Sequence, residues 1–418
     1  MTRNTPRVVI IGGGFAGLNA ARIFRGRRVE VTIVDRRNHH LFQPLLYQVA
    51  TASLNPSDIA VPIRGIFRSQ ENVTVRLDHV DRIDTASKRL LTRGGAIEYD
   101  YLIIATGATH SYFGKDDWGQ HAPGLKTIED ALEIRKRVLL AYEMAEKATT
   151  HEEQREWMTF VVIGAGPTGV EMAGALSEIA EHSMTRDFRR IDPKSARVVL
   201  IEGTDRVLPA YPDELSAKAE IQLRGLGVEV MKGKRVTGIT GQEVIFGDEK
   251  IGTRTVIWAA GVQASPLAAS LGTPLDRAGR VVVESDLSVP GHPEVFVAGD
   301  LASVMSHGEP VPGVAPAAMQ EGKHAAKNVV RLIEGQPTAR FAYVDKGSLA
   351  TIGRAAAVAD FGRLRFSGFF AWFLWLGIHI FFLIGFRNRL FVLLQWAWAY
   401  LTYRRGARLI TGDVGEEK

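Results

Sequence analysis

Short apolar runs recur along the chain, and each is followed by a glycine-rich turn and a stretch of small and apolar residues. Arg7 to Ile11 begins one such series, and Phe160 to Ile163 begins another. Both series then reach a second apolar run that ends in an acidic residue. Parallel strands that are covered on both faces give runs of this kind, with helices between them. The pattern therefore predicts an α/β chain in which a unit of strand, turn, helix and strand occurs twice.

The first glycine turn carries Gly12, Gly14 and Gly17 in the spacing GxGxxG. In dinucleotide-binding units these glycines provide a tight turn, room for the pyrophosphate beside bare backbone, and close packing of helix on strand. The helix that follows offers free backbone N–H groups to phosphates. Asp35 ends the next apolar run, where a carboxylate can bind ribose hydroxyls. Because all these parts occur in register, we predict a dinucleotide site and not a purely structural turn.

The second turn has the same spacing at Gly164, Gly166 and Gly169, and Glu202 ends its next apolar run. A carboxylate in this place accepts hydrogen bonds from an adenosine ribose and repels a 2′-phosphate, which favours NAD over NADP. The two turns start 152 positions apart (164 minus 12), which indicates an internal duplication and not a short repeat. We therefore expect two Rossmann-like domains that hold two dinucleotides.

The amino-acid composition excludes several kinds of reactive site, although it says little about the fold. The 418 residues are enough for two nucleotide-binding domains and an appendage, and a net charge of +5 does not indicate a nucleic-acid partner. The chain contains no cysteine, which excludes disulfides, thiolate metal sites and iron–sulfur clusters. It also excludes a redox-active dithiol. No metal-ligand spacing is present in the sequence, so we expect no metal site.

The tail is more apolar and aromatic than the rest of the chain. Residues 366–386 include no formally charged side chain, and their one titratable group is His379. As a helix with about 1.5 Å per residue, this stretch would be ~31 Å long, enough to cross a bilayer core of ~30 Å. Arginines interrupt the tail, and a second apolar and aromatic stretch then covers residues 390–403.

Hydropathy alone favours a single spanning helix over residues 366–386, and a pair of helices lying in the membrane surface is the alternative. Arginines flank the tail on both sides, so the positive charges do not fix an orientation. The tryptophans and tyrosines of the second stretch suit the lipid headgroup region. A buried core, or a helix pair that joins two copies into a homodimer, would explain the same residues without a membrane.

Two segments resemble motifs of the two-dinucleotide-binding flavoproteins. Residues 100–108 resemble their ATG motif, and residues 294–301 resemble their terminal GD motif. The resemblance implies that FAD occupies the first site, that NADH occupies the second, and that an NAD domain is inserted into the FAD domain. The residues that it implies for FAD are Gly12, Gly14, Gly17, Asp35, Val80 through its backbone, Thr106 and Asp300. The residues that it implies for NADH are Gly164, Gly166, Gly169 and Glu202.

Three further segments, residues 39–50, 166–174 and 311–322, resemble type II NADH dehydrogenases, the single-subunit NADH:quinone oxidoreductases. The resemblance covers essentially the whole chain and implies a glutathione-reductase-like fold with C-terminal membrane-anchoring helices. It also implies a contact of Ala317 with FAD. The expected domains are an FAD domain over 1–120 and 266–340, an NAD domain over 121–265, and a membrane-anchor region over 341–418.

The same resemblance implies two residues that act on the substrates. Glu171 is expected near the nicotinamide, where it could position the ring or deliver a proton; a first-turn glutamate favoured by the helix dipole is the alternative. Gln320 is expected on the quinone side, and a helix-surface glutamine is the alternative. Many members of the family read AQxAxQ in this segment, and Pro316 here replaces a glutamine that contacts the quinone in them.

The expected activity is respiratory electron transfer without proton pumping. A hydride passes from NADH to FAD, and two electrons then pass to a membrane quinone, either ubiquinone or menaquinone. Because the chain has no cysteine relay, the reduced flavin must meet the acceptor directly. The expected place is the cytoplasmic face of a bacterial inner membrane, bound from one side through membrane lipid, since no apolar export segment precedes the first strand.

Three other functions fit parts of the sequence. A sulfide:quinone reductase shares the expected fold and tail, but the missing cysteines disfavour it. A soluble ferredoxin or rubredoxin reductase leaves the tail unexplained. An NADH-sensing binding module that resembles the apoptosis-inducing-factor proteins is the remaining alternative, and slow reoxidation of its flavin by quinone would favour it.

Overall fold

The computed structural model of the chain describes residues 5–184, 187–402 and 405–411. Backbone contacts divide the chain into two units, which we call unit 1 and unit 2. Unit 1 contains the described residues up to Leu41, Ala60–Thr109 and Val262–Lys346. Unit 2 contains Phe42–Ile59, the described part of His110–Gly261, and the described residues from Gly347 onward. The segment Phe42–Ile59, which the sequence places in the FAD domain, therefore belongs to unit 2.

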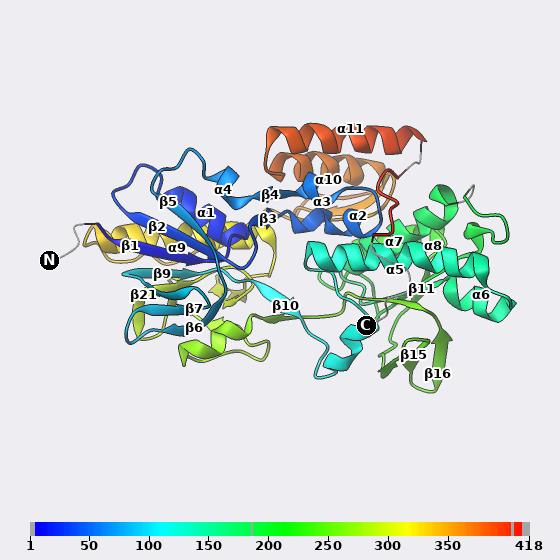
Figure 1. Cartoon of the computed structure of the whole chain (residues 1–418), viewed down its shortest axis with the longest axis horizontal. Helices are drawn as coiled ribbons and strands as arrows, with labels where there is room; N and C mark the ends of the chain where they lie inside the picture. Colours follow the sequence, from blue (N-terminus) through cyan, green and yellow to red (C-terminus); the bar gives the residue numbers. More distant parts are fainter. Residues whose placement is uncertain (1–4, 185–186, 403–404, 412–418) are drawn as a thin grey trace. The chain divides into compact units, whose positions relative to one another are not determined.

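Unit 1 is built on a six-stranded sheet in which β1 lies between β9 and β2, all three being parallel (Figure 1). In spatial order its strands are β20 (Ser288–Val289), β21 (His292–Val297), β9 (Tyr101–Ile104), β1 (Arg7–Ile11), β2 (Glu30–Asp35) and β5 (Val73–Leu77). Its helices are α1 (Phe15–Ile23), α4 (Ile63–Ile66) and α9 (Ala315–Ile333). Smaller sheets contain β3 (His39–Leu41) with β4 (Ala60–Pro62), β6 (Val80–Asp84) with β7 (Arg89–Thr92) and β8 (Gly95–Glu98), β19 (Val281–Val282) with β22 (Ala302–Ser303), and β23 (Met305–Ser306) with β24 (Glu309–Pro310).

Helices α1 and α9 pack very closely, because small residues face each other across their contact. A Cβ atom on Gly322 of α9 would lie 2.1 Å from the backbone oxygen of Ala16 in α1, so only glycine fits there. Ala16 also belongs to a small buried cluster with Ala298 and Ala318. The N-terminal ends of both helices are thereby held beside the end of β1, where the first glycine turn lies.

Unit 2 contains a second parallel sheet of the same kind. Its strands in spatial order are β13 (Glu229–Met231), β12 (Arg197–Ile201), β11 (Thr159–Ile163) and β17 (Thr255–Trp258). The helices of this part are α2 (Leu46–Ala50), α3 (Pro56–Ile59), α5 (Ile128–Lys147), α6 (His151–Trp157), α7 (Pro167–Glu178) and α8 (Asp213–Gly225), and β14 (Gly238–Ile239), β15 (Glu243–Phe246) and β16 (Glu249–Gly252) form a small antiparallel sheet. The predicted α/β fold with two Rossmann-like domains is confirmed.

The tail of unit 2 forms an antiparallel sheet of β25 (Ser348–Gly353), β26 (Ala356–Asp360) and β27 (Arg365–Ser367), followed by α10 (Phe369–Phe382) and α11 (Phe386–Thr402). Helix α10 packs on the sheet through Ala371, which contacts Ala357 and Ala359. Helix α11 contacts α10 and α3 (Figure 1). The buried residues of α10 are Ala371 and Trp375, whereas several of its phenylalanines are exposed.

The single spanning helix that hydropathy favours over residues 366–386 is wrong. The backbone leaves the helical conformation at Leu383, and Gly385 adopts a positive φ of 93°, so two separate helices form. Within the described part of the chain, no helix is both long enough and apolar enough to cross a bilayer. Hydropathy averages over a window and therefore misses a three-residue break.

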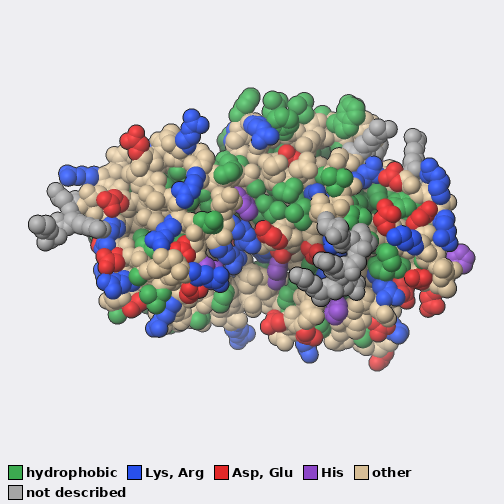
Figure 2. Space-filling view, in the orientation of Figure 1, with side chains coloured by type: hydrophobic (Ala, Val, Ile, Leu, Met, Phe, Trp, Pro, Cys, Tyr) green, Lys and Arg blue, Asp and Glu red, His purple; other side chains and the backbone are tan. Residues whose placement is uncertain are grey.

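The tail exposes large apolar side chains on one face. Phe381 is 69% exposed, and the other exposed aromatic or leucine side chains of α10 and α11 are Phe369, Phe370, Phe373, Phe386, Leu390, Phe391, Leu393, Leu394, Trp398, Tyr400 and Leu401. Figure 2 shows hydrophobic side chains gathered over α11. We call this set the aromatic face. Tyr403 and Arg404, at the end of the predicted second stretch, lie outside the described residues.

Candidate functional site

The two glycine turns have nearly the same backbone geometry. Gly12 has a φ of 102° and Gly164 a φ of 99°, a region that favours glycine. A Cβ on Gly12 would lie 2.3 Å from the backbone oxygen of Ala105, and one on Gly164 would lie 2.5 Å from Cα of Ala260. Each turn therefore passes against the end of a neighbouring strand, where no side chain fits.

The other glycines of each turn divide into a packed one and an open one. A Cβ on Gly17 would lie 1.9 Å from the oxygen of Gly12, and one on Gly169 would lie 1.7 Å from the oxygen of Gly164. A Cβ on Gly14 or Gly166 would meet nothing within 4 Å among the described atoms. Gly14 and Gly166 are the residues that immediately precede α1 and α7. The space beside them is where the N–H groups of a helix start can bind a pyrophosphate.

Both acidic residues are fixed against their own glycine turn in the same way. Asp35 accepts hydrogen bonds from the backbone nitrogens of Gly13 (2.6 Å) and Arg37 (2.7 Å). Glu202 accepts them from Ala165 (2.7 Å) and Thr204 (2.8 Å). Each carboxylate oxygen accepts one backbone bond and has a lone pair left for a ribose hydroxyl. The two nucleotide-binding units therefore share the same pair of backbone hydrogen bonds to the acidic residue, in addition to their similar sequences.

The remaining residues expected to bind FAD all lie in unit 1. Val80 begins β6, Asp300 follows β21, and Ala317 is buried in the first turn of α9. Thr106 follows β9, and its hydroxyl oxygen is buried with no hydrogen-bond partner among the described residues. An unpartnered buried hydroxyl beside an open glycine turn fits a polar cofactor.

Two residues of unit 1 that sequence reasoning did not select support the same place. His40 is buried, its Nδ1 lies 3.1 Å from the Gly13 oxygen, and burial lowers its pKa to about 4, so the ring is neutral. Glu321 accepts a 2.5 Å hydrogen bond from the Gly299 nitrogen, and burial raises its pKa to about 7, with nearby Asp300 also raising it. Both side chains are hydrogen-bonded to backbone atoms that lie next in sequence to residues expected to bind FAD.

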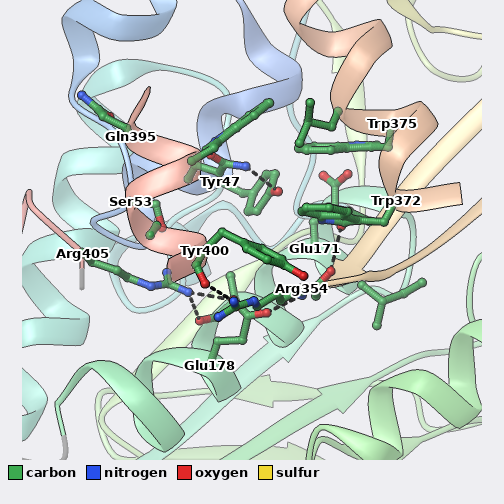
Figure 3. Close-up of a pocket in the computed structure, with 18 of the residues that line it drawn as sticks. Tyr47, Ser53, Glu171, Glu178, Arg354, Trp372, Trp375, Gln395, Tyr400 and Arg405 are labelled. Carbon is green, nitrogen blue, oxygen red and sulfur yellow. Dashed lines mark hydrogen bonds and ion pairs between the residues drawn. The ribbon is translucent and has the colours of Figure 1, made fainter. Parts of the chain in front are cut away.

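A pocket lies in unit 2, enclosed by α2, α7, β25 and the two tail helices (Figure 3). It has a volume of about 890 Å³, which includes space open to solvent. Its aromatic lining residues are Tyr47, Trp372, Trp375, Trp396 and Tyr400, and its polar ones include Gln48, Glu171, Glu178, Arg354, Gln395 and Arg405. Ligand pockets commonly combine such apolar walls with a few polar groups.

Glu171 is the predicted site residue that lies in this pocket. It is in the second turn of α7, and it accepts a hydrogen bond from the backbone nitrogen of Thr351. Burial raises its pKa to about 8, which the bond from Thr351 only partly offsets. The raised pKa favours the protonated form of Glu171 near neutral pH, and this form can donate a proton to a bound molecule.

A second carboxylate of α7, that of Glu178, connects several segments that line the pocket. Glu178 forms a 3.1 Å ion pair with Arg405, and it accepts a 2.5 Å hydrogen bond from the backbone nitrogen of Arg354. Arg405 also donates to the backbone oxygens of Thr51 (2.8 Å) and Ala175 (3.2 Å). Its side chain is only 9% exposed. One guanidinium thus joins α7, the segment after α2 and the end of the tail (Figure 3).

Gln320 lies in unit 1, on α9, and its amide is already bonded within the chain. Its Nε2 donates to the backbone oxygens of Val344 (2.9 Å) and Pro316 (3.2 Å), and its Oε1 accepts from the Val344 nitrogen (3.0 Å). Pro316 lies in the first turn of α9, where a missing N–H costs nothing. Gln320 belongs to unit 1 and Glu171 to unit 2. The two residues that were expected to act on the substrates are therefore not neighbours within one unit.

Two family models match the chain. A model described as pyridine nucleotide-disulphide oxidoreductase matches residues 6–322, and one described as NDH2 C-terminal domain matches residues 346–405. Two relatives from Mycobacterium tuberculosis are named type II NADH:quinone oxidoreductase NdhA and Ndh. The first is 46% identical over 98% of this chain and 90% of its own length, and the second is 45% identical over 97% and 90%.

Solved structures show the same fold. NDH2 from Plasmodium falciparum, in complex with NADH, superposes with a TM-score of 0.88 and 20% identity over 98% of this chain and 100% of that one. A sulfide:quinone oxidoreductase from Aquifex aeolicus superposes with a TM-score of 0.75 and 20% identity over 92% of both chains. At these identities the likeness concerns the fold alone.

Proposed function

The chain belongs to the type II NADH:quinone oxidoreductase family, and we propose that it performs the family's reaction with the residues described above. The observation that carries the proposal is the pair of glycine turns, each with its own fixed carboxylate, combined with a pocket beside the aromatic tail. The absence of cysteine disfavours a sulfide:quinone reductase. FAD, when bound, accepts the hydride of NADH and returns two electrons to a quinone.

The chain's own residues bind and align the nucleotides. In unit 1, the open space beside Gly14 receives the pyrophosphate of FAD, and Asp35 accepts the ribose hydroxyls. Thr106 and Asp300 bind the rest of the cofactor, with Val80 contacting the adenine through its backbone and Ala317 lining the site.

In unit 2, NADH binds in the same way. The space beside Gly166 takes its pyrophosphate, and Gly164 and Gly169 keep that space clear. Glu202 accepts hydrogen bonds from the adenosine ribose. Its negative charge repels a 2′-phosphate, so we expect NADH to be preferred over NADPH.

We place the quinone head group in the pocket of unit 2. The aromatic walls exclude water from a planar apolar ring, and Glu171 supplies a proton donor at the wall. The tail helices that line the pocket also carry the aromatic face. A quinone dissolved in lipid can therefore enter the pocket along these helices. Gln320 stays a candidate for the quinone side, where it fixes the backbone at Val344.

The function is tested anaerobically with the FAD-loaded protein. NADH should bleach the flavin absorbance, and a ubiquinone or menaquinone analogue added afterwards should restore it. Repeated cycles with excess substrate should follow. If quinone fails to restore the flavin spectrum, the proposed function is rejected and an NADH-sensing module is favoured.

Replacing Glu171 with glutamine should slow the quinone step and leave the NADH step unchanged. Glutamine keeps the shape and a hydrogen-bond donor but cannot give up a proton, and a general acid contributes about 100-fold to a rate. Reoxidation of the flavin by quinone is the measurement, with flavin reduction by NADH as the control. Unchanged rates for both steps would remove Glu171 from the mechanism.

The same variant has a pH signature. Because the pKa of Glu171 is about 8 in the fold and near 4.5 in the unfolded chain, the folded state binds an extra proton between these values. Wild-type stability should therefore fall as pH rises from 5 to 8, relative to the glutamine variant. The wild-type quinone rate should fall above pH 8, where the acid ionises, and the variant's rate should not.

We propose further that the aromatic face binds the lipid surface from one side, on the cytoplasmic face of a bacterial inner membrane. Large apolar side chains are exposed along both tail helices, and each is worth about 1.5–3 kcal/mol when fully removed from water. Arg387 and Arg389 lie beside this face and suit lipid phosphates.

Replacing Phe381 with aspartate should weaken membrane binding about tenfold or more, since a charge then takes the place of a ring that we expect to enter the lipid. Cosedimentation with vesicles of phosphatidylcholine and phosphatidylglycerol measures it. Leu77→Asp is the matched control, because Leu77 is an exposed apolar residue that belongs to unit 1 and is not part of the aromatic face. If wild-type protein stays in the supernatant as a homodimer, the face joins two copies and the membrane proposal is overturned.

A further inference from the structure

Three side chains at the pocket wall form a hydrogen-bonded chain with a fixed direction. Nε1 of Trp396 donates to Oε1 of Gln48 at 2.7 Å, and Nε2 of Gln48 donates to the hydroxyl oxygen of Tyr47 at 2.9 Å. An indole nitrogen can only donate, so it must meet the amide oxygen of Gln48. The amide nitrogen then faces Tyr47 and can only donate as well. The Tyr47 hydroxyl is therefore the acceptor of this bond, and its own proton must point elsewhere.

The surroundings of Tyr47 keep that proton in place. Its side chain is only 7% exposed. Burial raises the pKa of Tyr47 well above its ordinary value, and the nearby Glu171 raises it further. The raised pKa favours the neutral hydroxyl, which keeps a proton to donate, and Tyr47 lines the pocket.

A second donor lines the same pocket. Trp375 is 2% exposed, and its Nε1 has no hydrogen-bond partner among the described residues. Leaving a buried donor unpaired is unfavourable, so native structures usually pair such groups with protein, water or a ligand. Trp375 thus lines the pocket from α10 and has an indole N–H that still needs an acceptor.

The ligand that suits these groups is planar, uncharged and rich in carbonyl oxygen. The rings of Trp372 and Tyr400 stack with their centroids 5.6 Å apart and form one wall of the pocket. We propose that Tyr47 and Trp375 donate hydrogen bonds to the carbonyl oxygens of the quinone head group, and that Trp396 of α11 aims the Tyr47 hydroxyl through Gln48. The proposal rests on the function proposed above, because it takes this pocket as the quinone site.

The test uses the full-length, FAD-loaded protein and decylubiquinone as the probe. Tyr47→Phe removes the donor and keeps the ring, and Trp396→Phe removes the constraint on Gln48 and keeps an aromatic wall. Tyr142→Phe is the matched control, because Tyr142 is a buried tyrosine of unit 2 that does not line the pocket. The readouts are the dissociation constant by calorimetry without NADH, the KM for the quinone, and the rate of flavin reduction by NADH.

Tyr47→Phe should raise the dissociation constant and the KM about three- to tenfold, the worth of one neutral hydrogen bond, with flavin reduction unchanged. Trp396→Phe should give a smaller rise, since the Gln48 amide can then turn. The double variant should be no worse than Tyr47→Phe alone, because both changes act on one bond.

Three results would overturn parts of the proposal. Quinone binding equal to wild type in Tyr47→Phe removes Tyr47 as a donor. Additive losses in the double variant remove the role of Trp396 in aiming it. Equal losses in Tyr142→Phe would show a general loss of packing. If the wild-type protein itself never reduces quinone, the proposed function fails, and that outcome is distinct from these three.

Discussion

Replacing Gly169 with alanine is expected to abolish NADH binding while FAD stays bound. The new Cβ would lie 1.7 Å from the backbone oxygen of Gly164, so the start of α7 must move away from its turn. The N–H groups that bind the pyrophosphate move with it, and we expect affinity to fall at least about 100-fold, or ~3 kcal/mol. FAD is expected to remain because its own turn, at Gly12, lies in unit 1. Thermal stabilisation by NADH and the flavin absorbance per protein measure the two effects.

Gly166→Ala is the matched variant for this experiment. Its Cβ meets nothing within 4 Å in the described protein, so stability should match the wild type. The methyl group would occupy the space that we assign to the pyrophosphate, and NADH affinity should fall about tenfold or more. Stability that drops with unchanged NADH binding would place the nucleotide elsewhere. Gly17→Ala and Gly14→Ala repeat the comparison for FAD.

Replacing Arg405 with methionine should cost about 1–3 kcal/mol of folding free energy, because Glu178 and two backbone oxygens then lose their hydrogen-bond donor. Glu178 would lose its cation, and the oxygens of Thr51 and Ala175 would lose their donor. Burial lowers the pKa of Arg405, and the negative charge of Glu178 offsets part of that shift. Urea unfolding of the FAD-loaded protein measures the loss.

Arg408→Met is the control, since it lies three positions away and pairs with the exposed Asp187. Exposed pairs are worth less than about 1 kcal/mol. The double variant Arg405→Met with Glu178→Gln should recover part of the loss, because no charge is then left unpaired. Equal losses for Arg405 and Arg408 would contradict a special role for the buried guanidinium.

The parts of the site that the sequence predicted are the local ones. Glycine spacing and the acid at a strand end are set within about forty residues, and Asp35 and Glu202 indeed lie against their own turns. The pocket could not be predicted, because its walls come from distant segments. Gln48 and Trp396, for example, are 348 positions apart. Glu178 could have been predicted from the sequence, because it lies two helical turns after Glu171 and therefore on the same face of α7.

The tail shows where hydropathy fails, although the expectation of binding from one side agrees with a tail that has no spanning helix among its described residues. Its composition correctly indicated an apolar surface, but length alone suggested a spanning helix. The break at Leu383 depends on backbone geometry, with Gly385 in a conformation that other residues adopt rarely. A hydropathy average contains no information on that geometry.

The segment Phe42–Ile59 has a consequence for how the protein is made. Strands β3 and β4 pair at its two ends, and between them the chain contributes α2 and α3 to unit 2. Thr51, near the start of the chain, then binds Arg405, near its end. Contacts of such high sequence separation form slowly and leave apolar surface uncovered meanwhile. Unit 2 therefore cannot be completed on the ribosome until residue 405 has emerged.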